Sequence, residues 1–175
     1  AAFAAAKQKL FVAYYRRALP RFLKVCELLA AGAIGALSGV NYRHMSLPPN
    51  VDPARIAWRV TAHDGGGGLF LDLGSHLLDF LDFCVGPLQD VHGSAAQAAA
   101  DYAVEDTVAM TFRTATGVPG TAAWNFASPI PDDTLEFLGS AGRISLTVFT
   151  GDPVRLETAR GVEQFDLPNP PHIAQ

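Results

Sequence analysis

The residues best suited to chemistry are an aspartate and a histidine that lie one helical turn apart. Asp72 and His76 stand at positions i and i+4 of a segment, 69–85, whose apolar residues recur at helical spacing. A carboxylate at this spacing can orient an imidazole, raise its pKa and stabilise its protonated form. A histidine with a pKa near neutrality suits the transfer of a hydroxyl proton, which the oxidation of an alcohol requires. The pair predicts an acid/base site, with His76 as proton carrier and Asp72 as its partner or as a second carrier.

Four consecutive glycines, residues 65–68, come directly before this segment. Ordering them costs much backbone entropy, so we expect them where the backbone bends sharply or approaches something closely. They leave room for a ligand near the helix N-terminus, where the N–H groups and the dipole favour an anion or a developing alkoxide. Gly67 is therefore a candidate substrate contact, together with Asp79, which shares the helix face of Asp72 and His76.

Two other interpretations of the pair stay open. In an ordinary amphipathic helix, Asp72 occupies the favourable first turn and His76 is only its intrahelical partner. Alternatively, both side chains bind a metal ion together with His63 or Asp64. Two ligands without an established third are weak evidence, so the sequence predicts no metal site.

The elements that must position these residues form a mixed pattern of helices and strands. Residues 1–9 are typical of a helix end, and residues 10–15 of a short buried strand. A second helix is expected from Pro20 to about Gly32, and a strand from Gly35. Beyond the helix at 69–85, short apolar stretches separated by turn residues indicate consecutive antiparallel strands. These strands are expected at 88–98, 104–113, 118–127, 133–138, 142–149, 153–158 and 162–167.

Two of the expected strands indicate how the sheet is covered. Val108, Met110 and Phe112 alternate with small or hydroxylated residues, and Trp124 lies in a second strand of the same kind. The large apolar face should pack on the two helices, while the small, mixed face is available to another subunit. The fold class expected is α+β, an open and largely antiparallel sheet with helices packed on one face.

Composition excludes several other classes of protein. The 175 residues are 49% hydrophobic and 17% charged, as in one globular domain, and a net charge of -4 argues against nucleic-acid binding. Asp72, His76 and Asp79 interrupt the longest apolar stretch, so no membrane span is expected. Cys26 and Cys84 lie far apart and form no disulfide framework, which favours a reducing, cytoplasmic setting.

Residues 65–79, GGGGLFLDLGSHLLD, resemble the GGG-x-x-x-D-x-G-x-H-x-x-D signature of the Gfo/Idh/MocA oxidoreductases. This signature is the most specific part of a resemblance that covers essentially the whole chain. Other segments are similar to pieces of the family in the same order: residues 11–17 with Pro20, and residues 32–35, 105–108, 117–121 and 139–144.

The resemblance implies a two-domain enzyme. Residues 1–15 would be a remnant of an N-terminal Rossmann domain. Residues 16–175 would form the substrate-binding and oligomerisation domain, of the glyceraldehyde-3-phosphate dehydrogenase-like type, truncated at its C-terminal end. Asp72 and His76 match the acid/base pair of the family.

Three residues near the boundary between these domains would lie close to cofactor or substrate. They are Tyr14, Arg16 and Arg17, which otherwise are simply a tyrosine at a strand end and two solvated arginines.

The sequence also departs from the family pattern. No G-x-G-x-x-G occurs in the chain, and the E-K-P motif, whose lysine completes the catalytic set, is missing too. NAD or NADP would therefore be bound mainly by the missing domain, and this chain alone is expected to be inactive.

The function expected is hydride transfer between NAD(P) and a sugar, a cyclic polyol or a related hydroxy or keto compound, in a homo-oligomer built through the open sheet face. The alternative is a non-catalytic assembly or ligand-binding module of the same fold.

Overall fold

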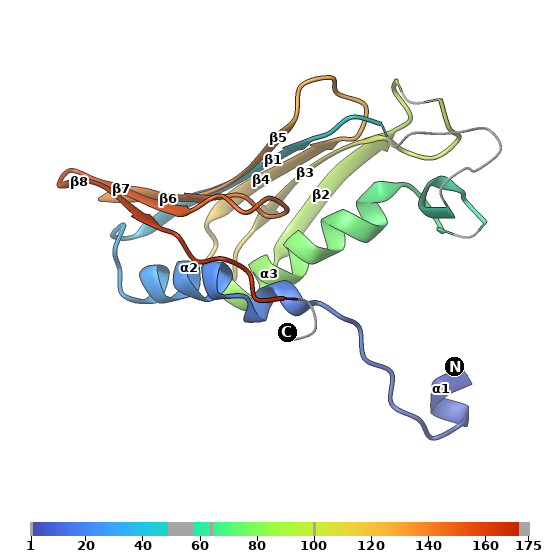
Figure 1. Ribbon diagram of the computed structural model, residues 1–175, viewed down its shortest axis with the longest axis horizontal. Coiled ribbons are helices and arrows are strands. Elements are labelled where there is room, and N and C mark those ends of the chain that lie inside the picture. Colours follow the sequence, from blue (N-terminus) through green and yellow to red (C-terminus); the bar gives the residue numbers. More distant parts are fainter. Residues whose placement is uncertain (1, 49–57, 64, 100, 172–175) are drawn as a thin grey trace.

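A computed structural model describes residues 2–48, 58–63, 65–99 and 101–171, and most of them form one sheet with two helices beneath it (Figure 1). The sheet has eight strands in the order β2-β3-β4-β1-β5-β6-β7-β8. The strands are β1 (Leu37–Met45), β2 (Gln89–Ala96), β3 (Thr107–Arg113), β4 (Pro119–Asn125), β5 (Asp132–Gly139), β6 (Gly142–Leu146), β7 (Val154–Thr158) and β8 (Gly161–Phe165). The predicted α+β class is confirmed, and every strand expected after the helix is present.

The position of β1 is the feature that the turn pattern does not predict. Consecutive strands were expected to be neighbours, but β1 lies between β4 and β5, parallel to the first and antiparallel to the second. Tyr42 of β1 thus pairs with Ala122 on one side and Leu135 on the other. All other neighbouring strands are antiparallel.

Two helices, α2 (Pro20–Ala30) and α3 (Ser75–Val85), cover one face of the sheet (Figure 1). They meet where the Phe22 and Phe80 rings pack edge to face, with centroids 4.7 Å apart. Beneath them lie fully buried side chains of the sheet, including Trp124 and Phe137. The predicted packing of the large apolar face on the two helices is confirmed.

The predicted helix over 69–85 is not α-helical throughout. Its first part, Phe70–Gly74 (η3), is a π-helical turn that leads into α3. Such turns are rare and often occur at functional sites. Here the turn sets the Phe70 ring edge-on against Trp124, 4.8 Å away. Gly74 is required at its end, because a Cβ there would lie 2.6 Å from the same Phe70 ring.

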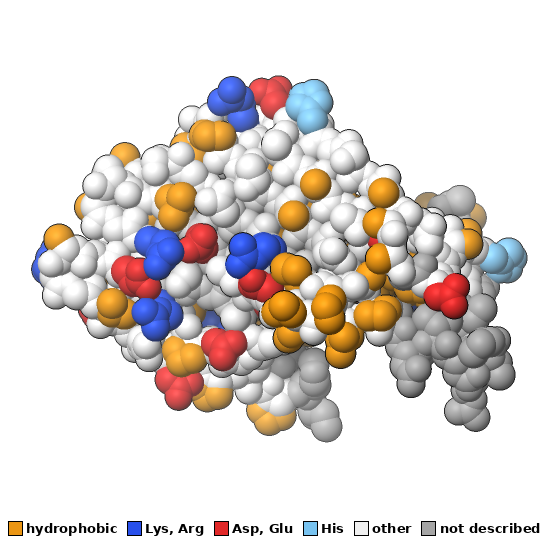
Figure 2. Space-filling model, turned by 90° about the horizontal axis from the view of Figure 1, so that it is seen from above, with side chains coloured by type: hydrophobic (Ala, Val, Ile, Leu, Met, Phe, Trp, Pro, Cys, Tyr) orange, Lys and Arg blue, Asp and Glu red, His pale blue; other side chains and the backbone are white. Residues whose placement is uncertain are grey.

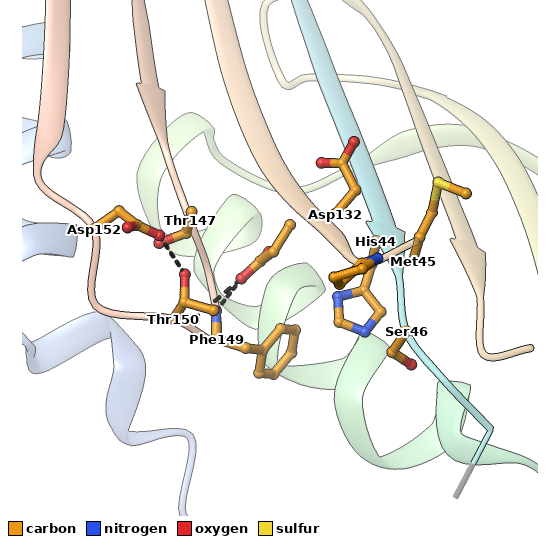
Figure 3. Close-up of a pocket in the computed structure, with 10 residues that line it drawn as sticks. His44, Met45, Ser46, Asp132, Thr147, Phe149, Thr150 and Asp152 are labelled. Atoms are coloured by element: carbon orange, nitrogen blue, oxygen red, sulfur yellow. Dashed lines mark hydrogen bonds between the residues drawn. The ribbon is translucent and has the colours of Figure 1, made fainter. Parts of the chain in front are cut away.

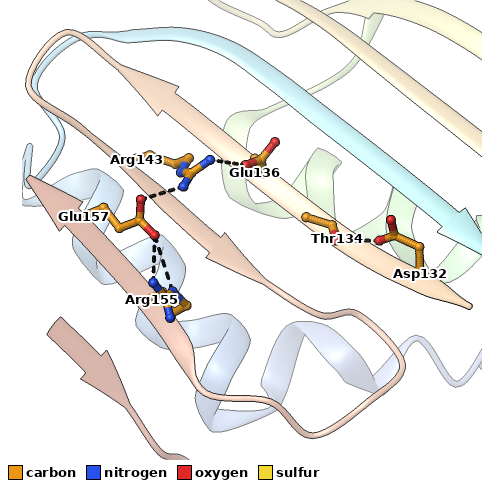
Figure 4. Close-up of polar contacts among 6 residues, drawn as sticks. All are labelled: Asp132, Thr134, Glu136, Arg143, Arg155 and Glu157. Atoms are coloured by element: carbon orange, nitrogen blue, oxygen red, sulfur yellow. Dashed lines mark hydrogen bonds and ion pairs between the residues drawn. The ribbon is translucent and has the colours of Figure 1, made fainter. Parts of the chain in front are cut away.

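The opposite face of the sheet is open. Ala109, Thr121 and Ala123 are exposed on it, and positive and negative side chains gather over the end that holds β5 to β7 (Figure 2). There Arg143 bridges Glu136 and Glu157 across three strands (Figure 4). This face therefore combines small side chains with charges that are already paired.

The segment before α2 differs from the prediction. A short helix, α1 (Ala2–Ala5), is followed by chain that extends away from the rest of the protein (Figure 1). The expected buried strand at 10–15 is wrong, since Leu10, Phe11 and Val12 are 64%, 83% and 64% exposed. A strand needs a hydrogen-bonded neighbour, and none of the strands described in this chain pairs with the segment.

Two single-turn 3-10 helices complete the structure: η1 (Tyr15–Ala18), just before α2, and η2 (Trp58–Val60). Within the described ranges, no helix is both long and apolar enough to cross a membrane.

Candidate functional site

His76 lies in the first turn of α3 and faces two tyrosines of the preceding segment. The rings of Tyr14 and Tyr15 approach its imidazole edge-on, with centroids 5.7 and 5.8 Å away. Its Nδ1 is buried and has no hydrogen-bond partner. Leaving a buried polar atom unpaired costs about 1–3 kcal/mol, so the position calls for an explanation beyond packing.

The pKa of His76 depends on more than its acidic neighbour. Asp72 raises the pKa of the imidazole, as expected, but the net pKa is lowered from the ordinary 6.5. Burial is the main cause and the nearby charge of Arg16 adds to it, while Asp72 and Asp79 oppose them with smaller effects. His76 is therefore neutral at pH 7 and suited to accept a proton.

Asp72 is held by a residue that the sequence analysis did not single out. Its carboxylate accepts a hydrogen bond from Arg59 Nε at 2.7 Å, and the Arg59 guanidinium stacks on the Trp58 ring. The expected hydrogen bond between Asp72 and His76 is not formed. The Arg59 and Asp72 side chains are 47% and 40% exposed, so this ion pair is accessible to solvent.

Asp79 and Arg17, for which we predicted different ligands, bind each other. Arg17 donates to both carboxylate oxygens of Asp79, with its Nε 2.8 Å from Oδ2. The Asp79 side chain is only 9% exposed, against 40% for Arg17. The ion pair joins η1 to α3, so Asp79 is better explained as an anchor for Arg17 than as a substrate contact.

Gly67 and Gly68 approach this chain itself. The amide of Gly68 donates to Glu105 Oε1 at 2.8 Å, and a Cβ at Gly68 would lie 2.0 Å from the Glu105 carbonyl oxygen. Gly67 is buried between Leu71 and the same glutamate. The close approach predicted from the glycine run is present, and Gly67 and Gly68 make it to the segment before β3. The substrate contact of Gly67 stays a prediction.

Arg16, which we expected near the cofactor, faces inward. It is 9% exposed, donates to the Val148 carbonyl at 2.7 Å and lies 4.4 Å above the Phe149 ring. Arg21 has a similar structural role: it donates hydrogen bonds to carbonyls of the same loop, 147–152. The sequence did not predict this role. Both arginines therefore position that loop.

The metal-binding interpretation finds no support in the part of the chain that is described. No group of three or more potential ligands occurs there. Asp64, one of the suggested ligands, lies outside the described residues.

Residues 22–145 match the C-terminal domain of the GFO/IDH/MocA proteins. The chain belongs to this family. It is 25% identical over 169 residues to Oxidoreductase P35 of Formosa agariphila, an alignment that covers 95% of this chain and 52% of that protein. The chain thus spans about half the length of this curated relative.

Solved structures of other proteins share the fold of this chain. Levoglucosan dehydrogenase, in complex with NADH and levoglucosan, superposes with a TM-score of 0.76 at 20% identity, over 89% of this chain and 46% of that one. An oxidoreductase from Agrobacterium radiobacter, in complex with NAD+, L-tartaric acid and magnesium, gives a TM-score of 0.74 at 20% identity, over 95% and 48%.

Glu105 and Arg59 were missed by the sequence analysis for different reasons. Glu105 stands in the segment 105–108, which is part of the family resemblance. That resemblance, directly before a predicted strand, could have indicated a structural role for Glu105. Neighbouring Asp106 is fully buried and accepts hydrogen bonds from the amides of Ala98 and Ala99. Arg59 follows a proline-rich stretch of sequence and carries no comparable signal.

Proposed function

We propose that this chain is the substrate-side domain of an oxidoreductase that moves a hydride between NAD or NADP and a sugar, cyclic polyol or related hydroxy or keto compound. His76 takes the hydroxyl proton when the alcohol is oxidised and returns it when the carbonyl is reduced. The observation that carries the proposal is the placement of His76, whose ring lies beside those of Tyr14 and Tyr15 and whose buried Nδ1 has no hydrogen-bond partner.

The residues present fit only the reacting end of the cofactor. The chain has no G-x-G-x-x-G phosphate-binding motif, while Tyr14, from the segment before α2, packs against the imidazole of His76. The nicotinamide, when bound, supplies the hydride acceptor or donor. Tyr14 would bound the space next to it, and Arg17, whose guanidinium is paired with Asp79, would be a second contact.

Asp72 enters the proposal as an electrostatic partner of His76. It favours the protonated imidazole without touching it, because Arg59 holds its carboxylate. This attraction partly offsets the burial and the Arg16 charge, which disfavour the protonated imidazole.

The test uses the full-length protein that contains this chain. Oxidation of a panel of sugars and cyclic polyols is followed by nicotinamide absorbance, with His76→Ala beside His92→Ala, an exposed histidine of β2. His76→Ala should lower kcat by about two or more orders of magnitude, since general acid/base catalysis contributes that much. An unchanged kcat in His76→Ala would remove His76 from the role.

A non-catalytic assembly or ligand-binding module is the competing function. Titration of the 175-residue chain alone with NADH shows whether this domain binds the cofactor by itself. We expect no saturable fluorescence change, because the phosphates have no binding loop here. Turnover by the full-length protein would exclude the module.

We also propose that the open sheet face joins two copies of the protein and that the enzyme works in the cytoplasm. Small exposed side chains on β3 and β4 allow another sheet to approach closely, and the paired charges around Arg143 limit repulsion.

A further inference from the structure

Two cysteines that lie far apart along the chain come together between the two helices. Cys26 belongs to α2 and Cys84 to α3, and both are free thiols. The hydrogen bond between their side chains is the largest influence on the pKa of each thiol, so the two sulfur atoms face each other. Facing thiols can do what a single cysteine cannot, because their oxidation gives a disulfide within the protein.

The packing of the helices explains why the two side chains meet. The Phe22 and Phe80 rings touch across the contact between α2 and α3, with centroids 4.7 Å apart. Each cysteine follows its phenylalanine by four residues, which is about one helical turn and keeps it on the same helix face. The contact made by the two phenylalanines is therefore continued, one turn later, by the two cysteines.

A cavity of about 340 Å³ opens beside the pair. Cys26 and Cys84 both line it, and each is half-buried. The described residues of its wall are all uncharged, among them Leu29, Val85 and Thr116. Because a cavity of this volume can hold a small molecule, an uncharged reagent can reach the sulfur atoms from solvent.

This cavity is separate from the one at the end of β1. The wall there includes His44 and Met45 of β1, together with Phe149 and Thr150 of the loop 147–152 (Figure 3). The two cavities have no described lining residue in common. Chemistry at the cysteines can therefore be measured apart from binding in the cavity beside β1.

The two thiols are not equivalent. The hydrogen bond with Cys84 lowers the pKa of Cys26 below the ordinary 9.0, although burial opposes this effect. The same hydrogen bond, together with burial, raises the pKa of Cys84. Since the thiolate is the nucleophilic form of cysteine, Cys26 is suited to attack first and Cys84 to follow.

We propose that Cys26 and Cys84 form a site of reversible oxidation by small disulfide compounds. The Cys26 thiolate attacks the S–S bond of the compound, forms a mixed disulfide with one half and releases the other half as a thiolate. Cys84 then gives its proton to solvent and attacks the Cys26 sulfur, which releases the second half. Two electrons pass from the cysteines to the compound, both released thiolates take up protons from solvent, and a disulfide joins α2 to α3.

The disulfide would tether the helix that carries His76. His76, Phe80 and Cys84 follow one another at four-residue intervals along one stripe of α3. The same stripe packs on Tyr15 and Phe22. A bond between α2 and α3 also closes a long loop of chain, which restricts the unfolded state. The oxidised protein should therefore be the more stable form, whether or not the proposed function holds.

The experiment treats the protein that contains this chain with 2-hydroxyethyl disulfide, an uncharged probe that suits the uncharged cavity. Mass spectrometry of proteolytic peptides follows Cys26 and Cys84 in wild type, Cys26→Ser and Cys84→Ser. In wild type we expect a cross-link between the two cysteines that dithiothreitol reverses. Cys84→Ser should stop at a mixed disulfide on Cys26. Cys26→Ser should react about tenfold or more slowly, because the thiol that remains is the less acidic one.

Thermal melting shows whether the disulfide fits the native packing. Oxidised wild type should melt roughly 5 °C or more above the reduced protein. Dithiothreitol should remove this difference, and neither serine variant should show it.

Several outcomes would overturn the proposal. A wild type that stays reduced, or that carries a mixed disulfide on each cysteine without a cross-link, would do so. A cross-linked protein that melts below the reduced one would as well, since the bond would then form only in a distorted structure. Faster reaction of Cys26→Ser than of Cys84→Ser would reject the order of attack. The cross-link and the melting shift are measured on wild type, so they decide the proposal even if a serine variant fails to fold.

Discussion

His44 and His76 illustrate how burial governs the behaviour of single residues in this domain. Both imidazoles lose hydration, and this loss lowers the pKa of each despite carboxylates in their surroundings. The sequence predicted His76 as a functional candidate, because its i, i+4 spacing from Asp72 can be read directly from the residue order. The sign of its pKa shift was not predictable, since it depends on burial and on Arg16, a residue far away along the chain.

These two shifts predict acid-sensitive stability. Above the unfolded-state pKa of about 6.5, both histidines are neutral in both states and stability is at its full value. As pH falls from 7 through the lower folded-state pKa values, the unfolded chain binds protons first, so the free energy of unfolding decreases. Urea unfolding at pH 7.5, 6.5 and 5.5 should show this decrease, and His44→Gln should make it smaller.

The comparison for this measurement is His92→Gln, on exposed β2. Its pH profile should follow the wild type. A steeper decrease in His44→Gln than in wild type would contradict the explanation.

At the scale of elements, the glycine run and the segment before β3 form one structural unit. Gly68 binds Glu105, and Asp106 binds the amides of the loop that follows β2. The helix that carries His76 therefore begins from a support fixed to the sheet. Helices and strands were predictable from periodicity and turn residues. The π-helical turn and the Gly68–Glu105 contact were not, because both depend on packing between distant segments.

Substitution of Gly68 by alanine should therefore destabilise the domain. The added Cβ would lie 2.0 Å from the Glu105 carbonyl oxygen, a backbone atom that cannot move without shifting β3. We expect a loss of about 1–3 kcal/mol or more in the free energy of unfolding, as in other overpacked sites. Chemical denaturation with the slope held common to both proteins provides the measurement.

Gly151→Ala is the matched control for this experiment, because a Cβ at Gly151 meets nothing within 4 Å and its φ is not positive. It should change stability by less than about 0.5 kcal/mol, as is usual for surface positions. Equal effects in the two variants would show that the contact with Glu105 does not limit stability.

At the scale of the whole molecule, the two faces of the sheet differ in what covers them. Its helix-covered face holds the core and the candidate site at His76, while its other face is open and has small side chains at its centre. The insertion of β1 between β4 and β5 brings residues far apart in sequence, such as Asn41 and Thr121, into contact on that open face, with Thr121 Oγ1 2.9 Å from Asn41 Oδ1. Periodicity predicted two faces of different character, but a parallel partner for β1 could be identified only from the three-dimensional structure.

If the open face joins two copies, one bulky charge at its centre should separate them. Ala123 is exposed on β4, between Ala109 of β3 and Arg43 of β1. In a two-fold contact, Ala123→Arg would appear twice and place unpaired charges between two closely packed sheets. Light scattering of the full-length protein should show the mass falling from a multiple of the subunit to the monomer. Glu27→Lys, on the exposed side of α2 across the sheet, should leave the mass unchanged. An Ala123→Arg protein that keeps the wild-type mass would place the interface elsewhere.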